Sequence, residues 1–159
     1  MSPPTLSSWS ATAATLGAVA CSENEIKSLE AQIGHPLPIA YKQAFLAPMG
    51  NGAGIFLQGE DCFYAQLLAL QTWAQELLEE EAFPQVLPAD AFVFWMHQGY
   101  QFGFFRLSEG DNPPIYYFEE GQEEPEFRRI HDRFTDFLQA EWSLLQQLCG
   151  TPIQTPSQP

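Results

Sequence analysis

The chain has 159 residues, which suits one domain, and 45% of them are hydrophobic and 14% aromatic, so it can bury a core of its own. Lys and Arg number 6 against 20 Asp and Glu, which gives a formal net charge of -14. This charge argues against nucleic acid and anionic membranes as partners, because their phosphates would be repelled, and it favours a basic protein partner or simple solubility.

The three cysteines are Cys21, Cys62 and Cys149, and none of them sits in a C-x-x-C pair. We interpret them as reduced thiols of a cytoplasmic protein. The stretch TAATLGAVAC, which ends at Cys21, faintly resembles a lipoprotein cleavage site, so secretion is the alternative. Residues 1–20 contain no Lys or Arg and no strongly apolar segment, however, and both are elements of a signal peptide. No stretch reaches the length of a transmembrane helix.

The N-terminal part is predicted to form two helices after a flexible lead, residues 1–8. The first helix is short, and its inward positions would be Trp9, Ala13, Leu16 and Ala20. In the second, Ser22 and Glu25 form a capping box. Its apolar positions at helical spacing are Ile26, Leu29 and Ile33. Gly34 can close this helix in a left-handed conformation, and Pro36 cannot extend it.

A third helix is predicted to begin at Pro38, where the missing N–H of proline costs little. Its buried side would carry Tyr41, Ala44, Phe45 and Pro48, with Leu37 leading in. Lys42 and Gln43 are expected to point to water. The pair Asn51-Gly52 then supplies a turn, for which we expect a positive φ at Gly52.

The middle of the chain is harder to assign. We expect a short strand at AGIFL, residues 53–57, and extended structure over Phe63–Leu67. A helix then follows over about residues 70–81. The residues that mark its buried face would be Leu70, Trp73 and Leu77.

The segments FVFWMH and YQFGFFRL are predicted to form a β-hairpin joined by Gln98-Gly99. A two-residue turn would pair His97 with Tyr100, Trp95 with Phe102 and Val93 with Phe104 on one face, and Phe92 with Phe105, Phe94 with Gly103 and Met96 with Gln101 on the other. Both faces are therefore largely apolar, whereas a sheet with one solvated face alternates apolar and polar residues. Helices would pack on one face, and the other needs its own cover, a partner surface or a groove.

After the hairpin, IYYFEE is predicted to be a strand, followed by the acidic loop 119–126 and a short strand at FRRI. Asp132 is expected to cap the last helix, residues 133–149. The inward positions of that helix would be Phe134, Phe137, Leu138, Trp142 (or Leu145) and Leu148. The order of elements predicts an α+β fold with an antiparallel sheet. We expect a single domain over residues 9–149 and a flexible tail over residues 150–159.

The sequence offers little for catalysis. His35, His97 and His131 share no metal-binding spacing, and we expect no metal and no cofactor. The glycine-rich residues 50–54 follow a helix and precede a strand, which is the reverse of a phosphate-binding loop. The carboxylates of residues 119–126 could suggest acid/base chemistry, but they have no apolar pocket, so a solvated charge run is the simpler interpretation. The aromatic hairpin could stack bases, and the shortage of basic residues argues against that use.

The segment IKSLEAQIGHPLPIAYKQAFLAPMGNG closely resembles the opening of the SUKH superfamily, the SMI/KNR-type cell-wall-regulator homology domain. The residues that match the family pattern are Ile26, Leu29, Glu30, Ile33, Gly34, Leu37, Pro38, Tyr41, Phe45, Leu46, Asn51 and Gly52. Ile33 stands where leucine is usual. The resemblance covers about residues 9–149 and implies a curved antiparallel β-sheet packed with N-terminal helices and a C-terminal helix.

The resemblance implies binding and not catalysis, because the shared motif consists of packing and turn residues. Many bacterial members resemble immunity proteins that neutralise toxins, often nucleases, and fungal members are similar to cell-wall and signalling adaptors. An immunity protein with a basic toxin partner is therefore our first hypothesis, and a regulatory adaptor is the second. We expect the partner-binding residues to be Trp95, Tyr100, Phe102, Glu119, Glu120, Glu123, Glu124 and Glu126. Phe94 and Met96 would replace the aromatic residues if the other face of the hairpin binds.

Overall fold

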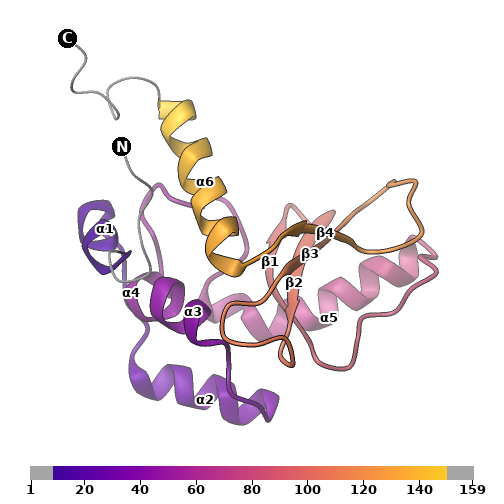
Figure 1. The fold of residues 1–159 in the computed structure, drawn as a ribbon, viewed down its shortest axis with the longest axis horizontal. Helices are drawn as coiled ribbons and strands as arrows, with labels where there is room; N and C mark the ends of the chain where they lie inside the picture. Colours follow the sequence, from indigo (N-terminus) through magenta and orange to yellow (C-terminus); the bar gives the residue numbers. More distant parts are fainter. Residues whose placement is uncertain (1–8, 150–159) are drawn as a thin grey trace.

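The computed structural model describes residues 9–149 and confirms the predicted α+β class (Figure 1). The helices are α1 (Trp9–Leu16), α2 (Glu23–Ile33), α3 (Ile39–Tyr41), η2 (Lys42–Leu46), α4 (Ala47–Met49), α5 (Tyr64–Glu80) and α6 (Phe134–Cys149). The strands are β1 (Ala91–His97), β2 (Gln101–Arg106), β3 (Ile115–Glu119) and β4 (Arg128–His131). The predicted flexible segments, residues 1–8 and 150–159, lie outside the described residues.

The four strands form one antiparallel sheet in the order β1-β2-β3-β4. Helix α5 packs along one face of this sheet (Figure 1). The continuous helical segment α3-η2-α4 and the start of α6 cover the other face, where their aromatic rings meet those of β1 and β2. The chain's own helices therefore contact both apolar faces of the predicted hairpin.

Polar contacts within the family motif hold the connection from α2 to α3. The capping box of Ser22 and Glu25 is confirmed, and Gly34 ends α2 with a left-handed φ of 73°. One carboxylate oxygen of Glu30 accepts hydrogen bonds from the backbone N–H of Leu37, at 2.7 Å, and from Nζ of Lys42, at 2.9 Å. Lys42 thus does not simply point to water, because it anchors the third helical segment to α2.

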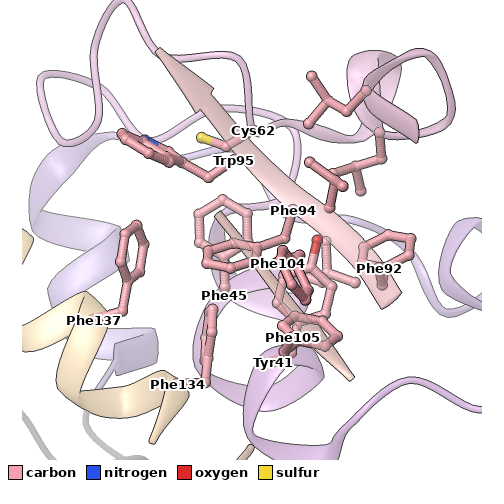
Figure 2. Packing of buried hydrophobic residues seen from close by; sticks show 14 of the residues in the cluster. Tyr41, Phe45, Cys62, Phe92, Phe94, Trp95, Phe104, Phe105, Phe134 and Phe137 are labelled. Carbon is pink, nitrogen blue, oxygen red and sulfur yellow. The ribbon is translucent and has the colours of Figure 1, made fainter. Parts of the chain in front are cut away.

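Tyr41 and Phe45 lie at the centre of the core, as predicted (Figure 2). The ring of Tyr41 packs within 5.1 Å of Phe105 and 5.2 Å of Phe134, measured between centroids. Helix α3 passes through the π-helical turn η2 into α4, which contains Pro48. Pro48 has no N–H to donate along the helix, and a wider turn just before it places Ala44, Phe45 and Leu46 in the core.

Asn51 ties the end of this helical segment to the start of α2. Its Nδ2 donates to the carbonyl of Ala20 and to the carboxylate of Glu25, both at 3.0 Å. The predicted positive φ at Gly52 is confirmed at 157°, and the N–H of Gly52 donates to the carbonyl of Met49 at 3.0 Å, which closes the turn. Gly52 also forms an isolated β-bridge with Val19.

Two predictions for the middle of the chain were wrong. Residues 53–57 form no strand, because Gly54 and Leu57 both have left-handed φ values, 60° and 57°, that break extended backbone. Residues 63–67 are not extended, because α5 already begins at Tyr64. The side-chain carbonyl of Gln66 accepts the N–H of Phe63 at 3.2 Å and caps the helix, which therefore begins earlier than expected.

The buried face of α5 also differs from the prediction at one position. Leu67, Leu70, Ala74, Leu77 and Leu78 are buried against the sheet. Trp73, which the sequence placed inside, is 43% exposed.

The hairpin register follows the prediction only near its open end. Phe92 pairs with Phe105 and Val93 with Phe104, but a bulge at Phe94 shifts the pairing by one residue beyond it. Trp95 therefore pairs with Gly103, and Met96 pairs with Phe102. The turn has three residues and includes Tyr100, whose N–H donates to the carbonyl of His97 at 3.1 Å. The bulge moves Trp95 onto the face of Phe94, away from Phe102.

Helix α6 begins close to the predicted position, but the predicted residue does not cap it. The side-chain carbonyl of Asn112 accepts the N–H of Thr135 at 3.1 Å, whereas the carboxylate of Asp132 pairs with Arg129 at 3.3 Å. The predicted inward residues Phe134, Phe137 and Leu138 are buried, and Trp142 and Leu145 pack partly against the core. Leu148 is 77% exposed, which corrects its predicted inward position.

Candidate functional site

A groove of about 420 Å³ lies beside α6. Figure 1 shows that α6 rises away from the sheet along its length. One wall is the second half of α6, and the other is the segment around residues 55–60. Its floor is the sheet face that carries Trp95, Gly103 and Tyr117. Several of its apolar side chains are exposed to a degree unusual for large hydrophobic residues: Ile55 at 49%, Ile130 at 39%, Leu144 at 46% and Leu148 at 77%. An apolar hollow of this kind is typical of a binding site.

Trp95 is the central aromatic residue of the floor. It stacks on Tyr117 with 5.8 Å between ring centroids, and the ring of Phe137 from α6 meets it edge-on at 6.0 Å. Figure 2 shows Trp95 and Phe137 on neighbouring elements. Trp95 is only 7% exposed, and its buried indole N–H finds no hydrogen-bond partner within residues 9–149. The floor is thus an aromatic surface held by ring contacts from β3 and α6.

Two carboxylates from separate segments border the same groove. Glu60 pairs with Nδ1 of His97 at 2.6 Å, and Glu141 projects from α6. Partial burial, followed by the nearby charge of Glu60, raises the pKa of Glu141 above its ordinary value, while His97 opposes that shift. No lysine or arginine of the described residues lines the groove.

The β4 side of the groove carries groups that are neutral near pH 7. Burial lowers the pKa of His131, although Asp136 and Asp132 oppose that shift. Burial and then the charge of Glu119 raise the pKa of Tyr117 to about 12, and the guanidinium of Arg128 lies 5.1 Å from the centre of its ring. The groove as a whole therefore combines apolar surface with negative charge.

The structure separates the predicted aromatic binding residues. Trp95 lines the groove, and Tyr100 lies beside it, half-buried, with its ring 5.5 Å from His97. Phe102 is fully buried on the opposite face of the sheet, against Phe118. We correct the prediction for Phe102, because the bulge in β1 separates it from Trp95. Phe94 and Met96, the alternative set, are both buried as well.

The predicted acidic loop lies mostly apart from the groove. Glu119 reaches it indirectly, because its carboxylate accepts a hydrogen bond at 3.0 Å from Gln101, which lines the floor. The remaining glutamates of the loop are Glu120, Glu123, Glu124 and Glu126, and all are exposed. The N–H of Gly121 donates to the carboxylate of Glu81 at 3.3 Å, so this loop lies against the C-terminal end of α5 (Figure 1). The loop and the groove are therefore separate surfaces.

The sequence analysis did not identify Glu60 and Glu141 as residues of the groove. The available signal was the spacing of Glu141, Leu144, Leu145 and Leu148, which places one carboxylate and three leucines on one face of α6. Glu60 had no such signal, since its position beside His97 depends on the irregular segment before α5.

The structure contains little that would suit a reactive centre. Burial raises the pKa of the Cys21 thiol to about 12 and the pKa of Cys62 well above its usual range, so neither thiol is activated. Within residues 9–149, no group of three or more His, Cys, Asp or Glu side chains could hold a metal ion. In the same range, no helix is long and apolar enough to span a membrane.

Comparison with known proteins supports the resemblance seen in the sequence. The family model of the SMI1 / KNR4 family (SUKH-1) matches residues 20–140, which include the motif from α2 to Gly52, the whole sheet and the start of α6. A search of curated proteins found no match to the chain. The match covers most of the chain, so the chain belongs to the SMI1 / KNR4 family (SUKH-1).

Proposed function

We propose that this chain is a non-catalytic protein-binding domain, an immunity protein that neutralises a toxin with a basic surface, such as a nuclease. The observation that carries the proposal is the groove beside α6, which joins exposed apolar residues to two carboxylates. Apolar side chains that fill such a hollow supply most of the binding energy of an interface. Membership of the SMI1 / KNR4 family agrees with this function, since many of its bacterial members resemble immunity proteins.

The net charge of -14 supports a basic partner, because a nuclease that grips nucleic acid must carry positive charge. The exposed glutamates of the β3–β4 loop would attract such a partner over distance, and the groove would hold it after contact. We further propose that the protein acts in the cytoplasm, where Cys21, Cys62 and Cys149 would stay reduced thiols.

The test uses the toxin domain encoded next to this gene, coexpressed with the full chain. The wild type should restore growth and form a stable complex on size-exclusion chromatography. Leu148→Ser should raise the dissociation constant about tenfold, because it removes an exposed apolar side chain from the groove. Its stability should change by less than about 0.5 kcal/mol, since Leu148 is 77% exposed.

The matched control is Val86→Ser, which removes an 84% exposed apolar side chain on another surface. It should leave the complex unchanged. Equal weakening by both variants would argue against the groove as the binding site. If no neighbouring toxin exists and the chain instead copurifies with a protein of its own cell, the regulatory adaptor becomes the better function.

A further inference from the structure

We infer that the groove beside α6 receives a lysine or arginine side chain, carried on an apolar peptide segment of the protein partner. This inference rests on the proposed function and specifies what the partner must present. The groove volume of about 420 Å³ suits one long side chain with its neighbours. The charge of the groove and its apolar walls define the occupant.

The charge of the groove selects a cation. Glu141 stands partly buried on α6 and makes no ion pair with a lysine or arginine within residues 9–149. Glu60 is on the opposite wall and is bound to His97. A partly desolvated carboxylate without a cation is costly, and an ammonium or guanidinium group beside it would remove that cost. An anionic occupant would instead be repelled by both glutamates.

The rest of the lining suits the stem of such a residue. Long cationic side chains lay their methylene groups along apolar surface while the charged end stays polar, and Leu144, Leu145 and Ile55 offer that surface beside Glu141. Trp95 forms the aromatic floor beneath that surface.

The experiment titrates the full chain with side-chain analogues and follows its NMR spectrum. The probes are n-butylguanidinium and n-butylammonium, with 1-butanol as the neutral analogue and pentanoate as the anionic one. Both cations should shift the indole signal of Trp95 and the methyl signals of Leu144. They should bind about tenfold more tightly than butanol, as expected for a hydrogen bond to a charged group, and pentanoate should not bind.

Glu141→Gln should weaken binding of both cations about tenfold and leave the weak binding of butanol unchanged. Glu76→Gln, an exposed glutamate on α5, is the matched control and should have no effect. The inference is wrong if butanol binds as tightly as the cations, if Glu141→Gln leaves cation binding unchanged, or if the cations shift signals only outside the groove.

The two proposals can fail separately. If the neighbouring toxin binds the wild type, is weakened by Leu148→Ser and is unaffected by Glu141→Gln, the groove binds a protein but does not select a cation. If the cations bind as expected but no toxin does, the proposed function falls and the cation site remains.

Discussion

At the scale of single residues, an aromatic core contrasts with a partly buried carboxylate, whose burial costs free energy. Tyr41 and the phenylalanines around it form a continuous aromatic core, which explains why the chain tolerates an irregular π-helical turn in η2. Against this background, Glu141 is an exception, because it is a half-buried carboxylate in an apolar wall. Such exceptions are more often related to binding than to folding.

The free energy of unfolding of the free protein should show the cost of burying the Glu141 carboxylate. Burial raises the pKa of Glu141 in the folded state, so folding disfavours the charged form. The protein therefore loses stability as the pH rises from the pKa of Glu141 in the unfolded chain to its raised pKa in the folded state. We therefore expect Glu141→Gln to be more stable than the wild type at pH 7. The difference should disappear at about pH 4, where Glu141 is protonated in the folded protein.

Urea denaturation of the free protein at the two pH values measures this difference. Glu76→Gln again serves as the control, because surface substitutions usually change stability by less than about 0.5 kcal/mol. A loss of stability in Glu141→Gln at pH 7 would show that the carboxylate contributes to folding, contrary to its assignment as a binding group.

At the scale of elements, the edge strand β1 has a protected backbone. Side-chain and backbone groups from outside the sheet bind its outward-facing N–H and carbonyl groups. The amide of Gln71 on α5 accepts the N–H of Val93 at 2.9 Å and donates to its carbonyl at 2.7 Å. Asp61 bonds Met96 through both backbone groups at 2.9 Å. This cover protects the edge from pairing with another chain and fixes α5 against the sheet beside the bulge.

Replacing Gln71 should therefore destabilise the fold more than its partly exposed position suggests. Gln71→Leu leaves the N–H and the carbonyl of Val93 without partners and should lower the free energy of unfolding by about 1–3 kcal/mol. Gln71→Glu keeps the acceptor for the N–H and should have a smaller effect. Chemical denaturation measures both variants.

Gln75→Leu makes the same substitution one turn later on α5, at an exposed position, and should change stability by less than about 0.5 kcal/mol. If Gln71→Leu were no more disruptive than Gln75→Leu, the contact with Val93 would not be holding the edge strand.

At the scale of the whole molecule, the exposed glutamates of the β3–β4 loop and the groove occupy different regions. The β3–β4 loop and the end of α5 place exposed glutamates side by side, since Gly121 is hydrogen-bonded to Glu81. The groove lies elsewhere, between α6 and residues 55–60. A basic partner would therefore meet a broad attractive field from the whole protein and a separate place for firm contact.

This arrangement predicts a specific kinetic result. Replacing Glu120, Glu123 and Glu124 with glutamine should slow association with a basic partner by about tenfold at low salt and flatten its salt dependence. Dissociation and stability should change little, because these side chains are exposed and lie outside the groove. Stopped-flow or surface-binding kinetics at several salt concentrations measure the effect.

A control with the same loss of charge replaces Glu23, Glu76 and Glu109, which are exposed elsewhere on the molecule. If both triple variants slow association equally, net charge and not the β3–β4 loop attracts the partner. If neither does, the loop glutamates serve solubility alone.

The sequence by itself determined the local structure wherever a short pattern has one physical solution. The capping box of Ser22 and Glu25, the left-handed Gly34, the burial of Tyr41 and Phe45, and the antiparallel α+β class could all be predicted. In each case neighbours within a few residues supply the hydrogen bonds or the apolar spacing. The family motif belongs to this class, which is why the family was recognisable before the fold.

Only the tertiary structure decided what joins segments far apart in the chain. The bulge at Phe94 and the capping of α6 by Asn112 depend on close packing or on side chains held in place by other elements. The bulge alone exchanged the partners of Trp95, because a shift of one residue moves a side chain to the other face of a sheet. The groove also depends on long-range packing, since Glu60, Trp95 and Glu141 meet only after α6 packs across that face.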